Sequence, residues 1–340
     1  MKQILKSLTF LVLFPICSFG QNYNVGEQTI VYTDSIRNRP IKTEFWYPTN
    51  EIDSTFEKKT DLPFILSPTI RNADFIKQEF PLVLLSHGTG GNRLGLAWLA
   101  IALAKQGYFV VAPDHWGNTF DNKITEYFVM YWERPLDISF LVTHILSDKS
   151  LSQYVDKEKI GVVGFSLGGY TSLALAGAVL NCNLLKTIAK TAEGKKEFNI
   201  PEIGDLRKLI ENIPCDSIQK SFKDNRIKSF VALSPALGLG FDNVEQTKSI
   251  SSPTLIIGAE NDQIAPIKTN AENYNKLIPN SMFIKLEGEV GHYIFLNEGN
   301  ESLKKEDKKY FKDDKTINRA EIHENVEKEI IKFFRNTLNK

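Results

Sequence analysis

The chain has 340 residues, a formal net charge of zero and 42% hydrophobic residues. This composition is typical of a globular protein with a large core, arranged as one large α/β domain or two small ones. Balanced charge removes the electrostatic argument for nucleic acid or an anionic membrane as the main partner, and leaves small neutral substrates open.

The first twenty residues have the pattern of a secretory signal peptide. Lys2 and Lys6 form a basic start, residues 8–16 are mostly apolar, and the small residues Ser18 and Gly20 occupy the positions of a cleavage site. The apolar run is too short for a stop-transfer helix, so the alternative is a buried N-terminal helix of the mature fold. We expect cleavage after Gly20 and export to the periplasm or the medium, with no membrane span left in the mature chain.

Apolar runs that alternate with helical patterns dominate the mature chain. Short β-rich runs come first, and residues 48–80 are expected to be mostly loop. Continuous apolar runs, typical of strands covered on both faces, then follow at 82–85, 108–112, 160–165, 230–233 and 254–257. Helical patterns occupy 94–105, 135–146 and 169–178, and a final amphipathic one covers 322–334. The alternation predicts an α/β fold with a mostly parallel central sheet and helices on both faces.

Residues 181–226 interrupt the alternation with short amphipathic stretches and no apolar strand; the stretches are 184–190, 206–213 and 218–222. We interpret this segment as a lid-like helical insertion over the active site, with a peripheral excursion as the alternative. It contains Cys182 and Cys215, an even number in an oxidising compartment, which could pair or remain two buried thiols. The charged run 298–317 is expected to be a solvated loop.

Gly164-Phe165-Ser166-Leu167-Gly168 matches the nucleophile-elbow pattern G-x-S-x-G. The strand at 160–165 and the Ala- and Leu-rich helix after it supply the strand-turn-helix context that this pattern requires. A serine hydroxyl is a poor nucleophile by itself, so a base must accept its proton and an acid must orient that base.

His292 is the predicted base, because the order in such sites is serine, acid, histidine. Of the histidines after Ser166, His323 lies within the terminal helix pattern and only His292 lies in a loop. The remaining histidines are interpreted as structural: His87, His115, His144 and His323.

Asp262 is the predicted acid. It follows the apolar strand at 254–257, and the carboxyl ends of parallel strands are where α/β sheets gather their sites. Glu260 and Asp242 are the alternatives, and a solvated loop carboxylate is the non-catalytic interpretation of Asp262.

The glycine-rich segment His87-Gly88-Thr89-Gly90-Gly91 follows the strand that ends at Ser86. In this arrangement the oxyanion donors are the N–H of the residue after the nucleophile and an N–H from this loop, which predicts Leu167 and Thr89. A phosphate-binding loop is the rival interpretation, but no Gly-Lys-Ser/Thr follows. No metal-binding motif is present in the sequence, so neither a metal nor another cofactor is implied.

Together these motifs resemble the α/β-hydrolase superfamily. They are most similar to bacterial proteins described as predicted dienelactone hydrolases, related to the platelet-activating-factor acetylhydrolases, at residues 84–88, 112–119, 134–138, 164–169, 318–320 and 333–335. The resemblance implies hydrolysis of carboxylic esters through an acyl-enzyme, without a cofactor, by Ser166, Asp262 and His292. In two places the chain departs from this pattern. Trp116 stands where a proline is expected, and Ser166 replaces the cysteine of true dienelactone hydrolases, which argues against that reaction.

We therefore expect a serine esterase that acts on a small-molecule ester, of short-chain or lipid type. A serine peptidase or amidase of the same fold is the enzymatic alternative, although residues 21–80 are too short for the large N-terminal β-domain that such peptidases often have. A catalytically inactive binding protein is the other alternative, against which the intact serine, aspartate and histidine argue. The sequence carries no signal for an oligomeric state.

Overall fold

The computed structural model describes residues 22–52 and 63–338. The expected signal peptide, residues 1–20, lies outside these ranges and stays a prediction. Within them, no helix combines the length and the apolar character needed to cross a membrane.

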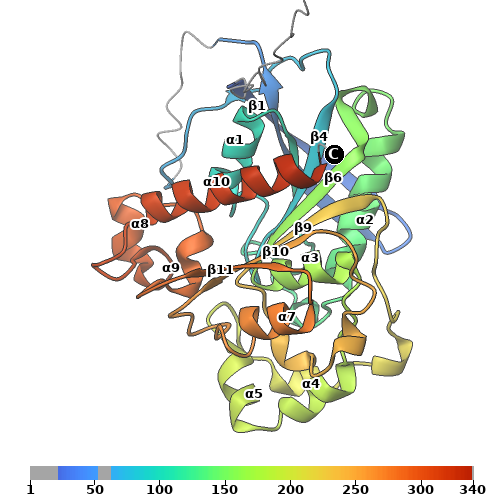
Figure 1. The fold of residues 1–340 in the computed structure, drawn as a ribbon, viewed down its shortest axis with the longest axis vertical. Coiled ribbons are helices and arrows are strands. Elements are labelled where there is room, and N and C mark those ends of the chain that lie inside the picture. The colour runs from blue at the N-terminus through green and yellow to red at the C-terminus, as the bar shows by residue number, and fades with distance from the viewer. Residues whose placement is uncertain (1–21, 53–62, 339–340) are drawn as a thin grey trace, which may run out of the picture.

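In the described ranges, a nine-stranded sheet forms the centre of the fold (Figure 1). Its strands are β1 (Asn24–Asp34), β2 (Arg39–Thr49), β3 (Ile70–Arg71), β4 (Phe80–Ser86), β5 (Phe109–Pro113), β6 (Val155–Phe165), β9 (Ile227–Leu233), β10 (Thr254–Ala259) and β11 (Met282–Leu286). Their order across the sheet is β11-β10-β9-β6-β4-β5-β2-β1-β3. The strands from β11 to β5 pair in parallel, whereas β2 pairs antiparallel with β5 and with β1.

Helices cover both faces of this sheet. The helices are α1 (Ala97–Lys105), α2 (Glu133–Ser147), α3 (Leu167–Ala176), α4 (Cys182–Ile188), α5 (Ala192–Glu197), α6 (Arg207–Glu211), α7 (Ala271–Leu277), α8 (Glu301–Glu306), α9 (Lys308–Phe311) and α10 (Arg319–Leu338). Alternate side chains of a strand point to opposite faces. Accordingly, Val83 and Leu85 of β4 pack in the cluster with α1 and α10, and Leu82 and Leu84 pack in the cluster with α2. The helices α3 and α7 cover the same face as α2, next to β9 and β10.

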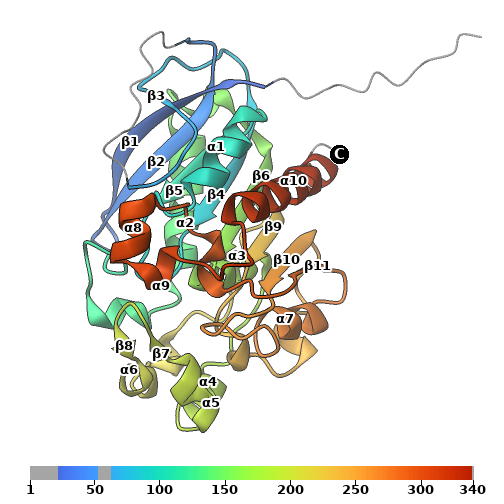
Figure 2. The same cartoon turned by 90° about the vertical axis from the view of Figure 1, so that its left-hand side faces the viewer.

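The segment 181–226 is largely helical and contains α4, α5 and α6, which Figure 2 shows together at the end of the molecule away from β3. A disulfide joins Cys182 to Cys215, with their Cα atoms 5.6 Å apart, so the paired alternative is the one that the structure shows. The structure adds two details that the sequence did not predict. The segment contains a small hairpin, β7 (Asn199–Ile200) with β8 (Gly204–Asp205), and residues 218–222 form no helix. Within residues 218–222, the side chain of Phe222 is buried.

The charged run 298–317 is not the plain solvated loop that we expected, because it contains α8 and α9. The side chain of Asn300 caps α8 by accepting a hydrogen bond from the backbone N–H of Leu303 at 2.9 Å. Leu303, Tyr310 and Phe311 recur at helical spacing among the lysines and face a cavity described below. Because most residues of the segment are charged, the helical spacing of its few apolar residues could not be recognised in the sequence.

Candidate active site

Ser166 lies at the sharp turn between β6 and α3, where its φ is +56°. This left-handed conformation is unfavourable for a non-glycine residue and persists where the surrounding structure enforces it. The two glycines of the motif allow the turn to close. A Cβ atom at Gly164 would lie 1.8 Å from the carbonyl oxygen of Gly168, and one at Gly168 would lie 2.0 Å from that of Ser86. Any side chain at either position would therefore open the elbow.

Ser166, His292 and Asp262 form one hydrogen-bonded chain, although they are far apart in the sequence. The Ser166 Oγ lies 2.9 Å from Nε2 of His292, and Nδ1 of His292 lies 2.6 Å from Oδ2 of Asp262. The three residues are buried, with exposed fractions of 6%, 4% and 3%. The structure thus brings together the three residues that the sequence predicted, in the geometry needed to remove the proton of a serine hydroxyl.

The surroundings of Asp262 determine which nitrogen of His292 carries hydrogen. Oδ1 of Asp262 accepts hydrogen bonds from the backbone N–H groups of Ile264, at 2.9 Å, and Ala265, at 2.8 Å. Oδ2 is therefore left for His292, whose Nδ1–H donates to it. Nε2 is then unprotonated and can accept the hydroxyl proton of Ser166.

The two alternative acids are engaged elsewhere. Asp242 is exposed, and its Oδ1 accepts a hydrogen bond from the side chain of Asn243 at 2.7 Å. Glu260 pairs with Lys285 at 3.0 Å and accepts from the backbone N–H of Gly288 at 2.7 Å. The geometry therefore favours Asp262 as the acid.

Thr89 and Leu167, the predicted oxyanion donors, both line a cavity that contains Ser166 and His292. Leu167 is the first residue of α3, so its N–H has no partner within the helix and lies at the positive end of the helix dipole. Among the described residues, neither the N–H of Thr89 nor that of Leu167 has a hydrogen-bond acceptor. Both amides are thus available to a substrate oxygen.

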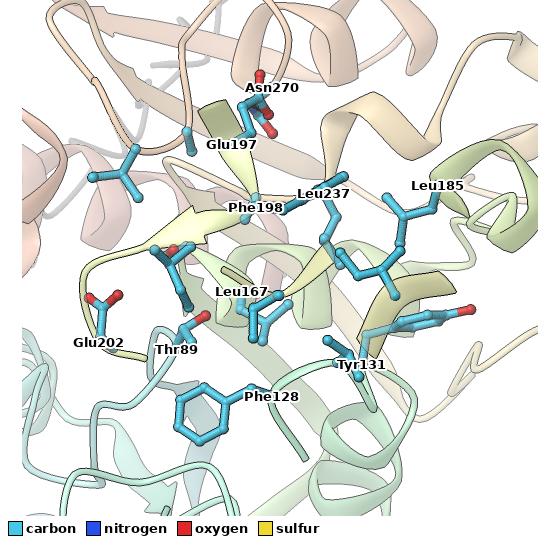
Figure 3. A pocket seen from close by; sticks show the side chains of 18 of the residues that line it. Thr89, Phe128, Tyr131, Leu167, Leu185, Glu197, Phe198, Glu202, Leu237 and Asn270 are labelled. Carbon is cyan, nitrogen blue, oxygen red and sulfur yellow. Dashed lines mark hydrogen bonds between the residues drawn. The ribbon is translucent and has the colours of Figure 1, made fainter. Parts of the chain in front are cut away.

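This first cavity has a volume of about 70 Å³ and lies between the carboxyl ends of the inner strands β4, β6, β9 and β10 and the segment 181–226 (Figure 3). Six apolar side chains of that segment line it: Leu185, Phe198, Ile200, Leu206, Ile210 and Ile213. On the other side it is bounded by residues that include Phe128, Tyr131 and Leu237. The walls are predominantly apolar, and the segment that we interpreted as a lid forms one of them.

Two carboxylates fasten this segment to the site. Glu197 of α5 accepts hydrogen bonds from the side chains of Thr269, at 2.5 Å, and Asn270, at 3.1 Å, and burial raises its pKa. Glu202, in the turn of the β7–β8 hairpin, accepts from the hydroxyl of Tyr293 at 2.8 Å. Because Tyr293 follows the predicted base directly, the hairpin is held beside the reacting groups.

A second cavity, of about 320 Å³, shares Thr89, Ser166, Glu202 and His292 with the first. Its apolar walls come from several parts of the chain: Leu96, Phe120, Tyr293, Leu296, Leu303 and Phe311. Ser166 therefore stands where two cavities of very different size meet.

The other histidines do not contact Ser166. His323 stacks on Trp98, with ring centroids 3.9 Å apart, and shares a 2.7 Å hydrogen bond with the carbonyl of Ile294; burial lowers its pKa to about 4. His144 is exposed and packs against Phe140. His87 and His115 belong to a buried polar network under the loop that contains Thr89, which no pattern in the sequence indicated.

Comparisons with known proteins agree with this architecture. Residues 81–189 match the family model described as the alpha/beta hydrolase fold. A solved structure of a ferulic acid esterase from Streptomyces cinnamoneus superposes with a TM-score of 0.60 at 17% identity, over 93% of this chain and 91% of that one. The sheet order, the elbow and these matches establish the α/β-hydrolase fold.

Two curated relatives are cutinases. The chain is 25% identical to cutinase est1 of Thermobifida alba over 201 residues, which is 58% of this chain and 48% of that protein. It is 23% identical to cutinase 2 of Thermobifida cellulosilytica over 211 residues, which is 61% of this chain and 58% of that protein. The chain thus spans about half the length of these relatives.

Proposed function

We propose that this protein is a serine carboxylic ester hydrolase. The observation that carries the proposal is the buried chain Ser166–His292–Asp262, next to two backbone N–H groups without acceptors among the described residues. The similarity to proteins named as cutinases and to a ferulic acid esterase supports ester hydrolysis over the other chemistries that this fold hosts.

In the proposed mechanism, Oγ of Ser166 attacks the ester carbonyl carbon while Nε2 of His292 takes the hydroxyl proton. The carbonyl oxygen becomes an oxyanion, to which Thr89 and Leu167 donate their N–H groups. When the tetrahedral intermediate collapses, the C–O bond to the alcohol breaks and His292 returns the proton to the departing oxygen. Water then repeats the sequence on the acyl-enzyme, releasing the acid and restoring Ser166. Asp262 keeps the imidazole in the required tautomer throughout.

The two cavities suggest the shape of the ester. The smaller cavity contains both oxyanion donors and is proposed to hold the acyl chain. The larger cavity is lined by Tyr293 and Leu296, which follow His292 in the chain. Because His292 must reach the departing alcohol oxygen, this cavity is proposed to hold the alcohol. A cavity of about 150 Å³ accommodates benzene. By that measure the smaller cavity fits an acyl group of about three or four carbons, and the larger one fits a bulky apolar alcohol.

Residues 181–226 act in this proposal as a lid that limits the acyl chain. Export of the mature chain, residues 21–340, is part of the same proposal, and the Cys182–Cys215 disulfide supports it because disulfides persist in oxidising compartments. The finer resemblance to acetylhydrolases and predicted dienelactone hydrolases also remains a proposal, supported by the motifs at 84–88 and 112–119.

A panel of p-nitrophenyl esters from acetate to palmitate, measured beside peptide anilides, tests the proposal. We expect kcat/KM to be highest for short acyl chains and Ser166→Ala to abolish turnover. Comparable cleavage of anilides would favour the peptidase or amidase alternative, and no turnover of any substrate would favour the binding protein.

Two matched variants, measured on the same panel of esters, test which cavity holds the acyl chain. Ile210→Ala enlarges the smaller cavity and should move the optimum to longer acyl chains, whereas Leu303→Ala in the larger cavity should leave the optimum unchanged. A shift of the acyl optimum in Leu303→Ala alone would reverse the assignment.

A further inference from the structure

A buried arginine holds the loop that supplies one of the proposed oxyanion donors. Arg134, the second residue of α2, is 1% exposed. Its Nη1 donates to the carbonyl oxygen of His87 at 2.6 Å, and its Nη2 donates to that of Gly88 at 3.0 Å. Burying a guanidinium is costly unless its hydrogen bonds are made. Here two of those bonds go to consecutive carbonyls of the loop.

His87 adds a second donor to the same carbonyl. Its Nε2 accepts a hydrogen bond from the backbone N–H of His115 at 3.1 Å, so the ring hydrogen must be on Nδ1. Nδ1 lies 2.7 Å from the carbonyl oxygen of Gly88, to which it donates. Nη2 of Arg134 lies 3.2 Å from the same Nδ1, but both atoms are donors in this tautomer, so Nη2 donates to the carbonyl of Gly88 instead. Burial, together with the charge of Arg134, lowers the pKa of His87 well below its ordinary value, which keeps this neutral tautomer.

The carbonyl of Gly88 is therefore fixed by several donors, since the N–H of Gly91 also reaches it at 3.2 Å. This carbonyl belongs to the same peptide unit as the N–H of Thr89. In a planar trans peptide the C=O and the N–H point in opposite directions, and the described part of the chain has no cis peptide bond. Holding the oxygen of Gly88 on the buried side therefore directs the N–H of Thr89 to the other side.

The loop also passes directly against the nucleophile. A Cβ atom at Gly88 would lie 3.1 Å from the ring of Phe165 and 3.3 Å from Cβ of Ser166. Beyond Thr89, the N–H of Gly90 donates to the side chain of Asn118 at 2.9 Å. The direction of the Thr89 amide is thus set within a loop that is held on both sides and lies next to Ser166.

We propose that Arg134 is a positioning residue for the oxyanion site: together with the Nδ1–H of His87 it fixes the Gly88–Thr89 peptide so that the Thr89 N–H faces the substrate oxygen. This inference rests on the proposed function and adds to it a residue that touches neither the substrate nor the triad. Loss of one oxyanion donor costs about 10²- to 10³-fold in kcat. Misalignment of a donor that is still present should therefore lower kcat by a smaller factor than its removal.

The chain offers a matched control, because Arg39 is also 1% exposed and belongs to the same buried network. Its guanidinium binds both carboxylate oxygens of Asp137, at 2.9 Å and 2.7 Å, and makes no hydrogen bond to the loop 87–91. Arg134→Lys and Arg39→Lys both keep the charge and both lose the planar fork. Only the first removes donors from the loop.

We expect both variants to unfold at lower temperature than the wild type. Arg134→Lys should lower kcat on the order of 10- to 100-fold with little change in KM, because the lost interaction exists mainly in the transition state. Arg39→Lys, measured where it is folded, should keep kcat within about threefold. Equal losses of kcat in the two variants, or a change confined to KM, would overturn the inference.

Two substitutions of His87 test the same carbonyl independently of whether the arginine variants fold. His87→Asn and His87→Leu both lose the acceptor for the N–H of His115, but the asparagine amide can still donate to the carbonyl of Gly88. The leucine variant should therefore have a kcat at least about tenfold lower than the asparagine variant. Equal values would contradict positioning. Failure of the proposed function looks different: wild-type turnover would then be absent or would survive Ser166→Ala.

Discussion

Replacing Asp262 by asparagine should reverse the tautomer of His292. In the structure, Oδ1 of Asp262 accepts from two backbone N–H groups, of Ile264 and Ala265, and Oδ2 faces Nδ1 of His292 at 2.6 Å. An asparagine must keep its oxygen toward those two donors, so its NH₂ group points at Nδ1. Nδ1 then becomes an acceptor and the ring hydrogen moves to Nε2. A histidine in that tautomer cannot take the proton of Ser166.

The expected loss in kcat is about 10⁴-fold, the size found when the orienting aspartate of serine proteases becomes asparagine. This corresponds to about 5.4 kcal/mol of transition-state stabilisation. The assay is kcat for p-nitrophenyl butyrate, with circular dichroism to verify folding. Asp242→Asn is the matched control and should cost less than about tenfold, because Asp242 is exposed and contacts neither Ser166 nor His292. The reverse ranking, or an Asp262→Asn variant within about tenfold of wild type, would refute the tautomer argument.

Three further predictions concern stability. Gly168→Ala places a Cβ atom 2.0 Å from a backbone oxygen and should lower the free energy of unfolding in urea by about 1–3 kcal/mol or more. Gly291→Ala, whose Cβ would meet nothing within 4 Å, should leave it unchanged. Equal losses in the two variants would contradict the close approach at Gly168. The disulfide Cys182–Cys215 predicts no free thiol in the unfolded, non-reduced mature protein and a loss of about 3–4 kcal/mol on reduction; two reactive thiols would exclude the pairing. Burial lowers the pKa of His323 to about 4 in the folded state. The stabilisation that neutral His323 provides is therefore fully present above about pH 6.5, and as the pH falls toward 4 the free energy of unfolding decreases by up to about 3 kcal/mol. His323→Phe should therefore show a shallower fall in Tm between pH 7 and 4, and an unchanged slope would contradict this assignment.

The sheet could be predicted from the sequence because its central strands are buried on both faces. Such strands must be apolar at nearly every position, as in β5 and β10, whose residues are all buried. The proximity of Ser166, Asp262 and His292 could be predicted because each follows a recognisable strand. Ser166 stands in the elbow after β6, Asp262 follows β10 and His292 follows β11.

Features that depend on long-range contacts could not be predicted in the same way. Arg134 acts on backbone carbonyls of the loop 87–88, which leave no pattern in the residues around it. The helices α8 and α9 could not be recognised because most of their residues are charged and few are apolar; Leu303, Tyr310 and Phe311 are the apolar ones that line the larger cavity. Two cysteines in one segment made a disulfide possible, but only the fold brings their Cα atoms to 5.6 Å.

The serine mechanism is tested most simply by labelling with a fluorophosphonate, followed by mass measurement of the intact protein and of its peptides. We expect a single adduct, on Ser166, that forms in step with the loss of ester hydrolysis. Ser166→Ala should take up no label and should show near-background turnover. An adduct on another residue, or a Ser166→Ala variant that keeps more than about a tenth of the wild-type kcat, would contradict the serine mechanism.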